Sequence, residues 1–208
     1  MQKITIIIEE NELKMEKVTI KRKTKETDIQ LTIEAGDSSE SVIDTGIPFL
    51  DHMLSHIAKH GLLRMDLKVK GDIEVDFHHT VEDVGIVLGE AFDKALADMT
   101  GVARYGHFTL PMEEVLCTVA IDIRKSPHFE YRVPDVFFGD IGVFDCELVK
   151  EFFRALAISA RLNLHILVQY GENKHHISEA IFKAFGKAFR MASAQEGSGV
   201  LYSTKGIL

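Results

Sequence analysis

A five-residue pattern occurs twice in this chain, 97 residues apart, and it limits the folds that the chain can adopt. His78-His79-Thr80-Val81-Glu82 and His175-His176-Ile177-Ser178-Glu179 carry two histidines and a glutamate at the same positions. At the same offset, Gly89-Glu90-Ala91-Phe92 matches Gly186-Lys187-Ala188-Phe189, and Leu67 matches Leu164. Because such a match in one register is improbable by chance, the sequence predicts two fused copies of a unit of about 90 residues.

Hydrophobic periodicity predicts the same kinds of element in both halves. In the first half it predicts strands over 3–8, 17–24 and 27–35, a helix over 48–61, two short strands between 63 and 75, and a helix over 78–99. In the second half it predicts extended segments over 102–110, 113–124 and 128–133, a helix over 145–160, a strand over 162–170 and a helix over 175–192.

These elements predict an α+β protein. We expect two duplicated sheet-and-helix units, each a two-layer α/β sandwich, related by pseudo-twofold symmetry. The predicted layout within one compact chain is an N-terminal extension over residues 1–16, a first unit over 17–105 and a second unit over 106–208.

Composition excludes several classes of partner. The chain has 208 residues, of which 46% are apolar, and a formal net charge of −8, so it can bury a core and lacks the basic clusters of a nucleic-acid or membrane-surface binder. No stretch approaches the ~18 apolar residues of a membrane span. The N-terminal apolar run is too short for a secretory signal. Cys117 and Cys146 form no disulfide or zinc pattern, which favours a reducing cytoplasm.

The spacing within each pattern suits metal binding. On a helix, residues four apart share a face, so His78 can chelate an ion together with Glu82, and His175 can do so with Glu179. The second histidine of each pair points about 100° away. Since adjacent histidines do not easily serve the same ion, the sequence predicts a pair of metal ions.

Two further histidines extend the predicted ligand set. His52 lies on the first long helix beside Asp51, which could orient it, and His165 lies on the strand before the second motif. Imidazole and carboxylate ligands without thiolate favour Mn, Fe or Zn, and such a set leaves coordination positions open for a substrate. The candidate metal ligands are His52, His78, His79, Glu82, His165, His175, His176 and Glu179. Structural or surface roles are expected for His56, His107 and His128.

These motifs and several others resemble imidazoleglycerol-phosphate dehydratase of histidine biosynthesis. The resemblance covers about residues 17–208 and rests on Thr45–Leu54 (TGIPFLDHML), Gly71–Asp72, His78–Asp83 (HHTVED), Ala103–Gly106 (ARYG), Glu172–Ile177 (ENKHHI) and Ser203–Gly206 (STKG). It implies the ribosomal-protein-domain-2-like form of the two-layer unit. It also implies loss of water from D-erythro-imidazoleglycerol phosphate to give imidazoleacetol phosphate, two Mn²⁺ ions per active site, and the same eight metal ligands. A hollow assembly of 24 subunits, with sites where subunits meet, is a further implication.

The resemblance also assigns substrate positions. They are Glu26, His60, Arg104, Lys183, Ser203 and Lys205, and the candidate catalytic residues are Glu26, His79 and Glu179. Loss of water beside an imidazole requires removal of an unactivated C–H proton, and Glu26 is the candidate acid/base for that transfer. The cationic and hydroxyl side chains can supply charge-assisted hydrogen bonds to the phosphate.

The chain departs from the family pattern at two places. The family commonly has Gly-Arg-Pro where this chain has Lys125-Ser126-Pro127, so Ser126 replaces an arginine expected at the phosphate. A residue two positions away on a strand shares the same face, so Arg124 is expected to take that place rather than Lys125. Phe77 occupies a position where the family often has an aspartate.

Two other classes of function stay open at this point. A two-metal hydrolase, such as a phosphatase, also uses paired ions about 3.5–4 Å apart, although such sites usually depend on bridging aspartates. A metal-storage or structural metal protein would be non-catalytic. A structural site would close its coordination sphere, typically with cysteines, and would not need cationic groups nearby.

Overall fold

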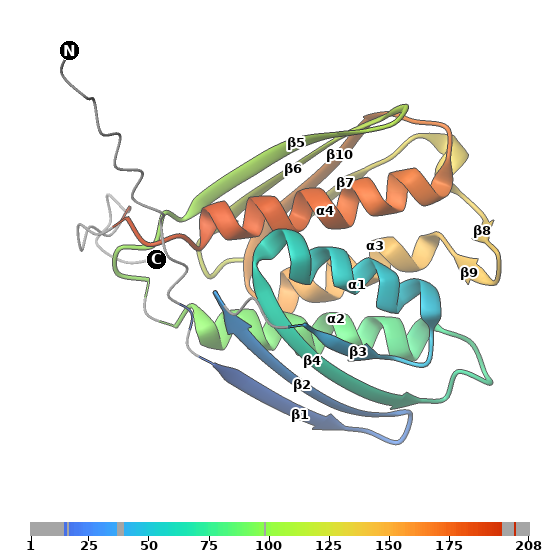
Figure 1. The fold of residues 1–208 in the computed structure, drawn as a ribbon, viewed down its shortest axis with the longest axis horizontal. Coiled ribbons are helices and arrows are strands. Elements are labelled where there is room, and N and C mark those ends of the chain that lie inside the picture. The colour runs from blue at the N-terminus through green and yellow to red at the C-terminus, as the bar shows by residue number, and fades with distance from the viewer. Residues whose placement is uncertain (1–14, 16, 37–39, 98, 197–201, 203–208) are drawn as a thin grey trace, which may run out of the picture.

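The computed structural model describes residues 15, 17–36, 40–97, 99–196 and 202, and its elements follow one order twice (Figure 1). The first half contains β1 (Val18–Lys23), β2 (Thr27–Ala35), β3 (Val42–Asp44), α1 (Pro48–Gly61), β4 (Leu63–Gly71) and α2 (His78–Ala95). The second half contains β5 (Tyr105–Met112), β6 (Val115–Ile123), β7 (His128–Arg132), α3 (Glu147–Ser159), β10 (Leu162–Tyr170) and α4 (Lys174–Ala192). A 3₁₀ turn (Asp135–Phe137) and a small hairpin of β8 (Asp140–Ile141) and β9 (Phe144–Asp145) precede α3.

The two four-stranded sheets have the same topology. Their strand orders are β1-β2-β4-β3 and β5-β6-β10-β7. In each sheet, neighbouring strands among the first three of the spatial order run antiparallel. The last two strands, β4 and β3 in one sheet and β10 and β7 in the other, run parallel, because a helix connects them. The prediction of an α+β fold with two duplicated sheet-and-helix units is therefore confirmed. The position of the division between residues 105 and 106 stays a prediction.

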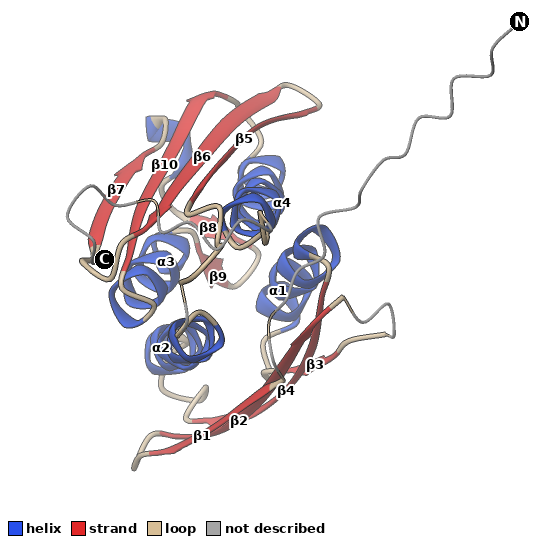
Figure 2. Ribbon diagram, turned by 90° about the vertical axis from the view of Figure 1, so that its left-hand side faces the viewer, coloured by secondary structure: helices blue, strands red, loops and turns tan. Residues whose placement is uncertain are grey.

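The four helices lie between the two sheets, and each sheet turns its other face outward (Figure 2). α2 packs on α3, and α1 packs on α4. An axis that exchanges the two units exchanges α1 with α3 and α2 with α4, so these two helix contacts are equivalent. Phe92 and Phe189, which match in the sequence repeat, stack on each other with ring centroids 4.0 Å apart. The repeat thus meets itself in the core.

Matching glycines allow both helix pairs to approach closely. A Cβ atom at Gly89 would lie 2.6 Å from the carbonyl oxygen of Leu156 on α3, and one at Gly186 would lie 3.0 Å from that of Ile57 on α1. Side chains larger than hydrogen would force the helices apart at these points. The repeated Gly-x-Ala-Phe segment therefore marks the two helix contacts.

Three expectations about elements need comment. The segment after Gly71 is a loop and not a second short strand, because the chain leaves the sheet there to begin α2, whose His78 N donates to Asp76 Oδ1 at 2.8 Å. α2 ends at Ala95, earlier than expected. The strand predicted over 3–8 lies outside the described residues. In the part of the chain that the structure describes, no helix has the length and apolarity needed to cross a membrane.

Candidate metal centre and substrate site

Three predicted ligands meet where α1 crosses the first turns of α4. Glu179 Oε1 lies 3.0 Å from His52 Nε2 and 3.0 Å from His175 Nε2. The ligand atoms of these three residues all lie within 4.8 Å of one another. α1 begins at Pro48, a residue suited to the first helical turn, and Asn173 caps α4 by accepting from the backbone N–H groups of His175 and His176. Both helix starts are thus fixed beside the cluster.

The second oxygen of Glu179 has different partners. Lys183 Nζ donates to Glu179 Oε2 at 2.5 Å, and His56 Nε2 lies 3.5 Å from the same oxygen. Burial opposes ionisation of Glu179, but the hydrogen bonds from Lys183, His52 and His175 outweigh it and lower its pKa to about 2. Glu179 therefore carries a negative charge, with Oε1 directed at two imidazoles and Oε2 held by the chain.

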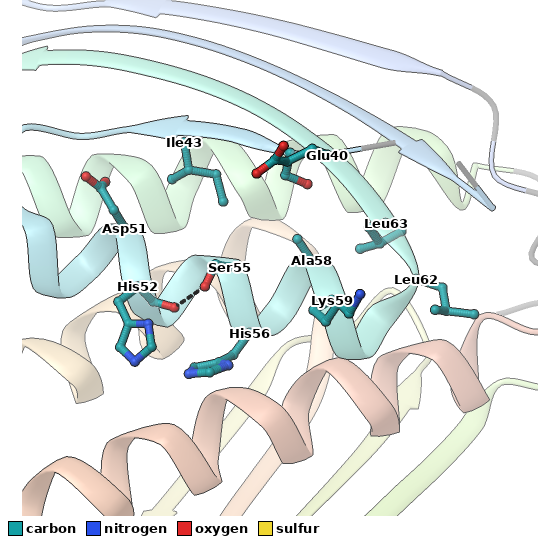
Figure 3. A pocket seen from close by; sticks show the side chains of 11 residues that line it. Glu40, Ile43, Asp51, His52, Ser55, His56, Ala58, Lys59, Leu62 and Leu63 are labelled. Atoms are coloured by element: carbon teal, nitrogen blue, oxygen red, sulfur yellow. Dashed lines mark hydrogen bonds between the residues drawn. The ribbon is translucent and has the colours of Figure 1, made fainter. Parts of the chain in front are cut away.

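The cluster continues as a polar seam between α1 and α4. His52, His56 and His60 follow one another at every turn of α1, and Glu179 and Lys183 do so on α4. Figure 3 shows His52 and His56 on the side of α1 that faces α4, and both line a hollow of about 820 Å³ beside β3. Burial lowers the pKa of His60, and the nearby charges of Lys187 and Lys183 lower it further.

His56 is a residue that the sequence reasoning set aside. Its side chain is only 16% exposed, its Nε2 has no hydrogen-bond partner among the described residues, and burial lowers its pKa to about 4. The spacing of four residues from His52 and from His60 is the signal that could have identified it. Asp51, expected as an orienting group for His52, instead accepts from Thr45 Oγ1 at 2.6 Å and fixes the start of α1.

The first motif forms its own group. His78 Nε2 lies 3.9 Å from Glu82 Oε2, and Arg154 Nη2 on α3 donates to Glu82 Oε1 at 2.9 Å. His79 Nε2 lies 3.9 Å from Glu26 Oε1. Among the described residues of one chain, the only set of three clustered metal-binding groups is His52, His175 and Glu179. One chain therefore does not bring the two motifs into a single cluster.

The second histidine of each motif is held through Nδ1. His79 Nδ1 lies 3.0 Å from Asp72 Oδ2, and His176 Nδ1 lies 2.9 Å from Glu114 Oε2. His165 is exposed on the outer face of β10, where its ring centroid is 5.5 Å from that of His128. Neither Asp72 nor Glu114 was selected as a site residue from the sequence. Glu114 is 62 residues from His176, and Asp72, seven residues from His79, reaches it only because the loop after β4 returns to the start of α2.

Arg104, a predicted phosphate residue, lies at the far end of α4 from the cluster, where its backbone N–H donates to the carbonyl oxygen of Ala192. Arg104 has a left-handed backbone with φ of 70°, and its guanidinium binds Asp122, with Nε 2.7 Å from Oδ1. Arg104 also donates to the carbonyl oxygen of Tyr202, the residue before Ser203. Ser203 and Lys205 themselves lie outside the described residues.

The segment after β6 contains Arg124 and Lys125, the two residues that could replace the arginine expected at the phosphate. Lys125 Nζ donates to Asp93 Oδ1 at 2.7 Å, which holds the side chain of Lys125 against α2. Arg124 is exposed directly after Ile123, whose N–H donates to the carbonyl oxygen of Arg104. The backbone of Arg124 therefore lies next to that of Arg104. Ser126 is exposed, and its side chain is short.

Comparison with known proteins gives one consistent family. The family model for imidazoleglycerol-phosphate dehydratase matches residues 45–189. The dehydratase of Leptospira biflexa is 53% identical over 189 residues, which cover 90% of this chain and 95% of that protein. That of Rhodopirellula baltica is 50% identical over 192 residues, covering 92% and 95%.

Solved structures agree with the sequence matches. The crystal structure of the dehydratase from Pyrococcus furiosus superposes with a TM-score of 0.79 at 37% identity, covering 91% of this chain and all of that one. The structure from Staphylococcus aureus gives a TM-score of 0.76 at 37% identity, covering 86% and 99%. Both the fold and the whole length of these relatives are therefore represented in this chain.

Proposed function

The chain belongs to the imidazoleglycerol-phosphate dehydratase family, and from this membership we propose that its active site uses two Mn²⁺ ions. The enzyme is a hydro-lyase of histidine biosynthesis that removes water from imidazoleglycerol phosphate and gives imidazoleacetol phosphate. The observation that carries the metal proposal is the position of Glu179 Oε1, 3.0 Å from the Nε2 atoms of both His52 and His175.

The donor atoms fit a divalent ion. Two imidazole nitrogens and a carboxylate oxygen converge without any thiolate, and such a set favours Mn, Fe or Zn. The ionised state of Glu179 supports the same assignment, because a ligating carboxylate must be deprotonated. Lys183 and His56 contact only Oε2, so Oε1 is available to an ion. The proposed ligands for the two ions are His52, His78, His79, Glu82, His165, His175, His176 and Glu179.

Glu26 is the proposed acid/base residue. When bound, divalent ions would hold the nitrogens of the substrate's imidazole and stabilise the charge that the ring takes up. Glu26 lies in the turn between β1 and β2, and its exposed carboxylate is 3.9 Å from His79 Nε2. The turn is anchored because Thr27 Oγ1 donates to the buried Asp83 at 2.5 Å. This placement lets Glu26 take the C–H proton and return one to the departing hydroxyl.

Cationic side chains are proposed to bind the phosphate. Lys183 borders the metal cluster, and its hydrogen bond to Glu179 keeps its ammonium group at the seam. Arg104, Arg124, Ser203 and Lys205 are proposed to complete the site. Support comes from the contact between Arg104 and the Tyr202 carbonyl oxygen, which brings the start of the C-terminal segment to the guanidinium. His60 is proposed to contact the substrate from α1.

We propose that the complete site forms where subunits meet in a large homo-oligomer, of 24 subunits by family resemblance. The side chains of His52, His78 and His175 are 44%, 45% and 42% exposed, so their ligand atoms can reach ions shared with another chain. A cytoplasmic location is proposed as well, which the two free and buried cysteines, Cys117 and Cys146, support.

Turnover by the manganese-loaded protein tests the proposal. Imidazoleglycerol phosphate should yield the keto-phosphate product, a chelator should stop the reaction, and added Mn²⁺ should restore it. Full activity after complete metal removal would contradict the metal proposal. Release of inorganic phosphate would indicate a two-metal hydrolase, and metal binding with neither product would indicate a non-catalytic metal protein.

A further inference from the structure

The two histidine pairs use their rings in a repeated way. In each motif the first histidine turns Nε2 toward the glutamate four residues later, as His175 does toward Glu179 at 3.0 Å. The second histidine instead turns Nδ1 toward a carboxylate from a loop outside its helix. These contacts are His79 to Asp72 at 3.0 Å and His176 to Glu114 at 2.9 Å.

We propose that Asp72 and Glu114 are positioning residues that set the tautomer and direction of His79 and His176, an inference that rests on the proposed metal-ligand roles of these histidines. A neutral imidazole carries one N–H. A carboxylate that accepts from Nδ1–H leaves the lone pair on Nε2, the atom on the far side of the ring, and this is the form that binds a metal. Neither carboxylate needs to touch the metal or the substrate.

Each carboxylate is itself fixed by the fold. Glu114 Oε1 accepts from the backbone N–H of Asn173 at 2.8 Å, so the residue that holds the ring of His176 also holds the loop that begins α4. The β5–β6 turn presents Glu114 through Glu113, whose backbone is left-handed with φ of 47°. Asp72 directly follows Gly71, and a Cβ atom at Gly71 would lie 2.0 Å from Thr80 Oγ1. The end of β4 is therefore pressed against the first turn of α2.

The two units supply the carboxylate from different positions. Asp72 follows the glycine that ends β4, and Glu172 occupies the corresponding place after Gly171 at the end of β10, although the 97-residue offset of the helix motifs pairs Asp72 with Gln169. Gly71 packs on Thr80, and Gly171 packs on Ile177. Thr80 and Ile177 are equivalent residues in the repeat. His176, however, is held by Glu114 and not by Glu172.

The different origin of the carboxylate in the two units bears on the role of Glu26. Glu114 directly precedes β6 just as Glu26 directly precedes β2, so these two glutamates are counterparts. In the second unit this position holds a ring through Nδ1. In the first unit Asp72 holds the ring, and Glu26 lies 3.9 Å from Nε2 of His79, on the ligand side. Because Asp72 holds the ring in the first unit, the carboxylate of Glu26 is left available for proton transfer.

Glu114→Gln tests the assignment through the hydrogen bond and not through shape. The amide oxygen can still accept from Asn173 N–H, while the amide NH₂ can only donate toward His176. His176 Nδ1 must then accept, which moves the ring proton to Nε2 and blocks the ligand atom. Asp72→Ala removes the acceptor at His79 Nδ1 without touching a backbone hydrogen bond, so it tests the proposal independently. Glu172→Gln is the matched control, because Glu172 is the counterpart that does not hold a ring.

The measurement is the Mn²⁺ affinity of the full-length protein by competition with a chelating dye, together with the melting temperature in excess chelator. Glu114→Gln and Asp72→Ala should each weaken Mn²⁺ binding by about 10–100-fold, with the melting temperature of the metal-free protein preserved, while Glu172→Gln should bind as the wild type does. Wild-type affinity in both test variants, or an equal loss in Glu172→Gln, would overturn the assignment. Absence of Mn²⁺ binding by the wild type would instead refute the proposed metal centre.

Discussion

At the scale of single residues, Glu179 connects the proposed metal ligands His52 and His175 with Lys183, a proposed phosphate ligand. Its Oε1 lies between two imidazoles, and its Oε2 binds Lys183 and lies near His56. The spacing within the second motif was enough to select Glu179 and His175, whereas His52 was selected from its place on the first long helix. His56 was not predicted as a site residue, although its spacing of four residues from His52 is visible in the sequence. Asp72 and Glu114 were not predicted either, because only tertiary packing places their loops against His79 and His176.

Replacement of Glu179 by glutamine should remove the charge that the cluster is built around. We expect at least an ~100-fold loss of activity and weaker metal-dependent assembly, measured by initial rates and by sedimentation with and without Mn²⁺. Glu90→Gln, the same change on α2, is the control. A fully active Glu179→Gln enzyme would refute the ligand role.

Replacement of Glu26 by glutamine should separate proton transfer from metal binding. The carboxylate is exposed and 3.9 Å from the nearest histidine nitrogen, so its loss should leave the metal content unchanged. Turnover should fall by about 10²–10⁴-fold, the usual contribution of a general acid or base. Metal analysis and kcat on the same sample provide the comparison, and unchanged kcat would rule out the acid/base assignment.

His56 should make the stability of the metal-free protein depend on pH. Burial lowers its pKa from 6.5 to about 4 in the folded state, so the unfolded chain binds more protons between these values. Stability should therefore fall as the pH is lowered from 6.5 to 4 and lose nothing further to this residue below 4. The difference of 2.5 units corresponds to about 3 kcal/mol.

Denaturant unfolding at several pH values measures this effect. His56→Gln should show a shallower loss of stability between pH 6.5 and 4 than the wild type, whereas His107→Gln, at an exposed position, should not. Equal slopes for the wild type and His56→Gln would show that His56 is not the titrating group.

At the scale of elements, the helix contacts explain why the repeat includes a glycine. Gly89 and Gly186 face helix backbones at the two equivalent contacts, α2 on α3 and α1 on α4. The seam of histidines on α1 reaches Glu179 and Lys183 only because α1 and α4 approach closely. The cluster of His52, His175 and Glu179, proposed to bind metal, therefore depends on packing at Gly186, about two turns from Glu179.

Gly89→Ala should destabilise the fold although alanine favours helices. The added Cβ would lie 2.6 Å from the carbonyl oxygen of Leu156, a backbone atom that cannot move away cheaply. We expect a loss of about 1–3 kcal/mol in the free energy of unfolding, measured by urea denaturation. Lys94→Ala on the exposed side of the same helix should change it by less than about 0.5 kcal/mol, and a stabilised Gly89→Ala would disprove the close contact.

Element boundaries were predicted best where periodicity was long. The four helices and the longer strands overlap predicted segments, whereas the short strands β3, β8 and β9 were not predicted and the loop after Gly71 was mistaken for a strand. That segment is rich in alternating residues, but it must leave the sheet so that Asp72 and Asp76 can reach the start of α2. The contacts of this loop with α2 therefore outweigh the strand-like alternation of its sequence.

At the scale of the whole molecule, duplication gave the fold, but it did not give the complete site. The sequence offset of 97 residues predicted two equivalent units, and the matching sheet orders confirm them. One chain nevertheless gathers only His52, His175 and Glu179 among the described residues, while His78 and Glu82 lie apart with Arg154. In the proposed oligomer, the contacts between chains depend on surfaces and not on motif spacing, so motif spacing alone could not predict them.

Anomalous diffraction at the manganese edge, from crystals of the assembled enzyme grown with Mn²⁺, tests the central claim most directly. We predict two Mn²⁺ ions per active site, with the ligands of both histidine-rich motifs around them and with residues of neighbouring subunits completing each site. A single ion, or ions bound away from His52, His175 and Glu179, would contradict the account.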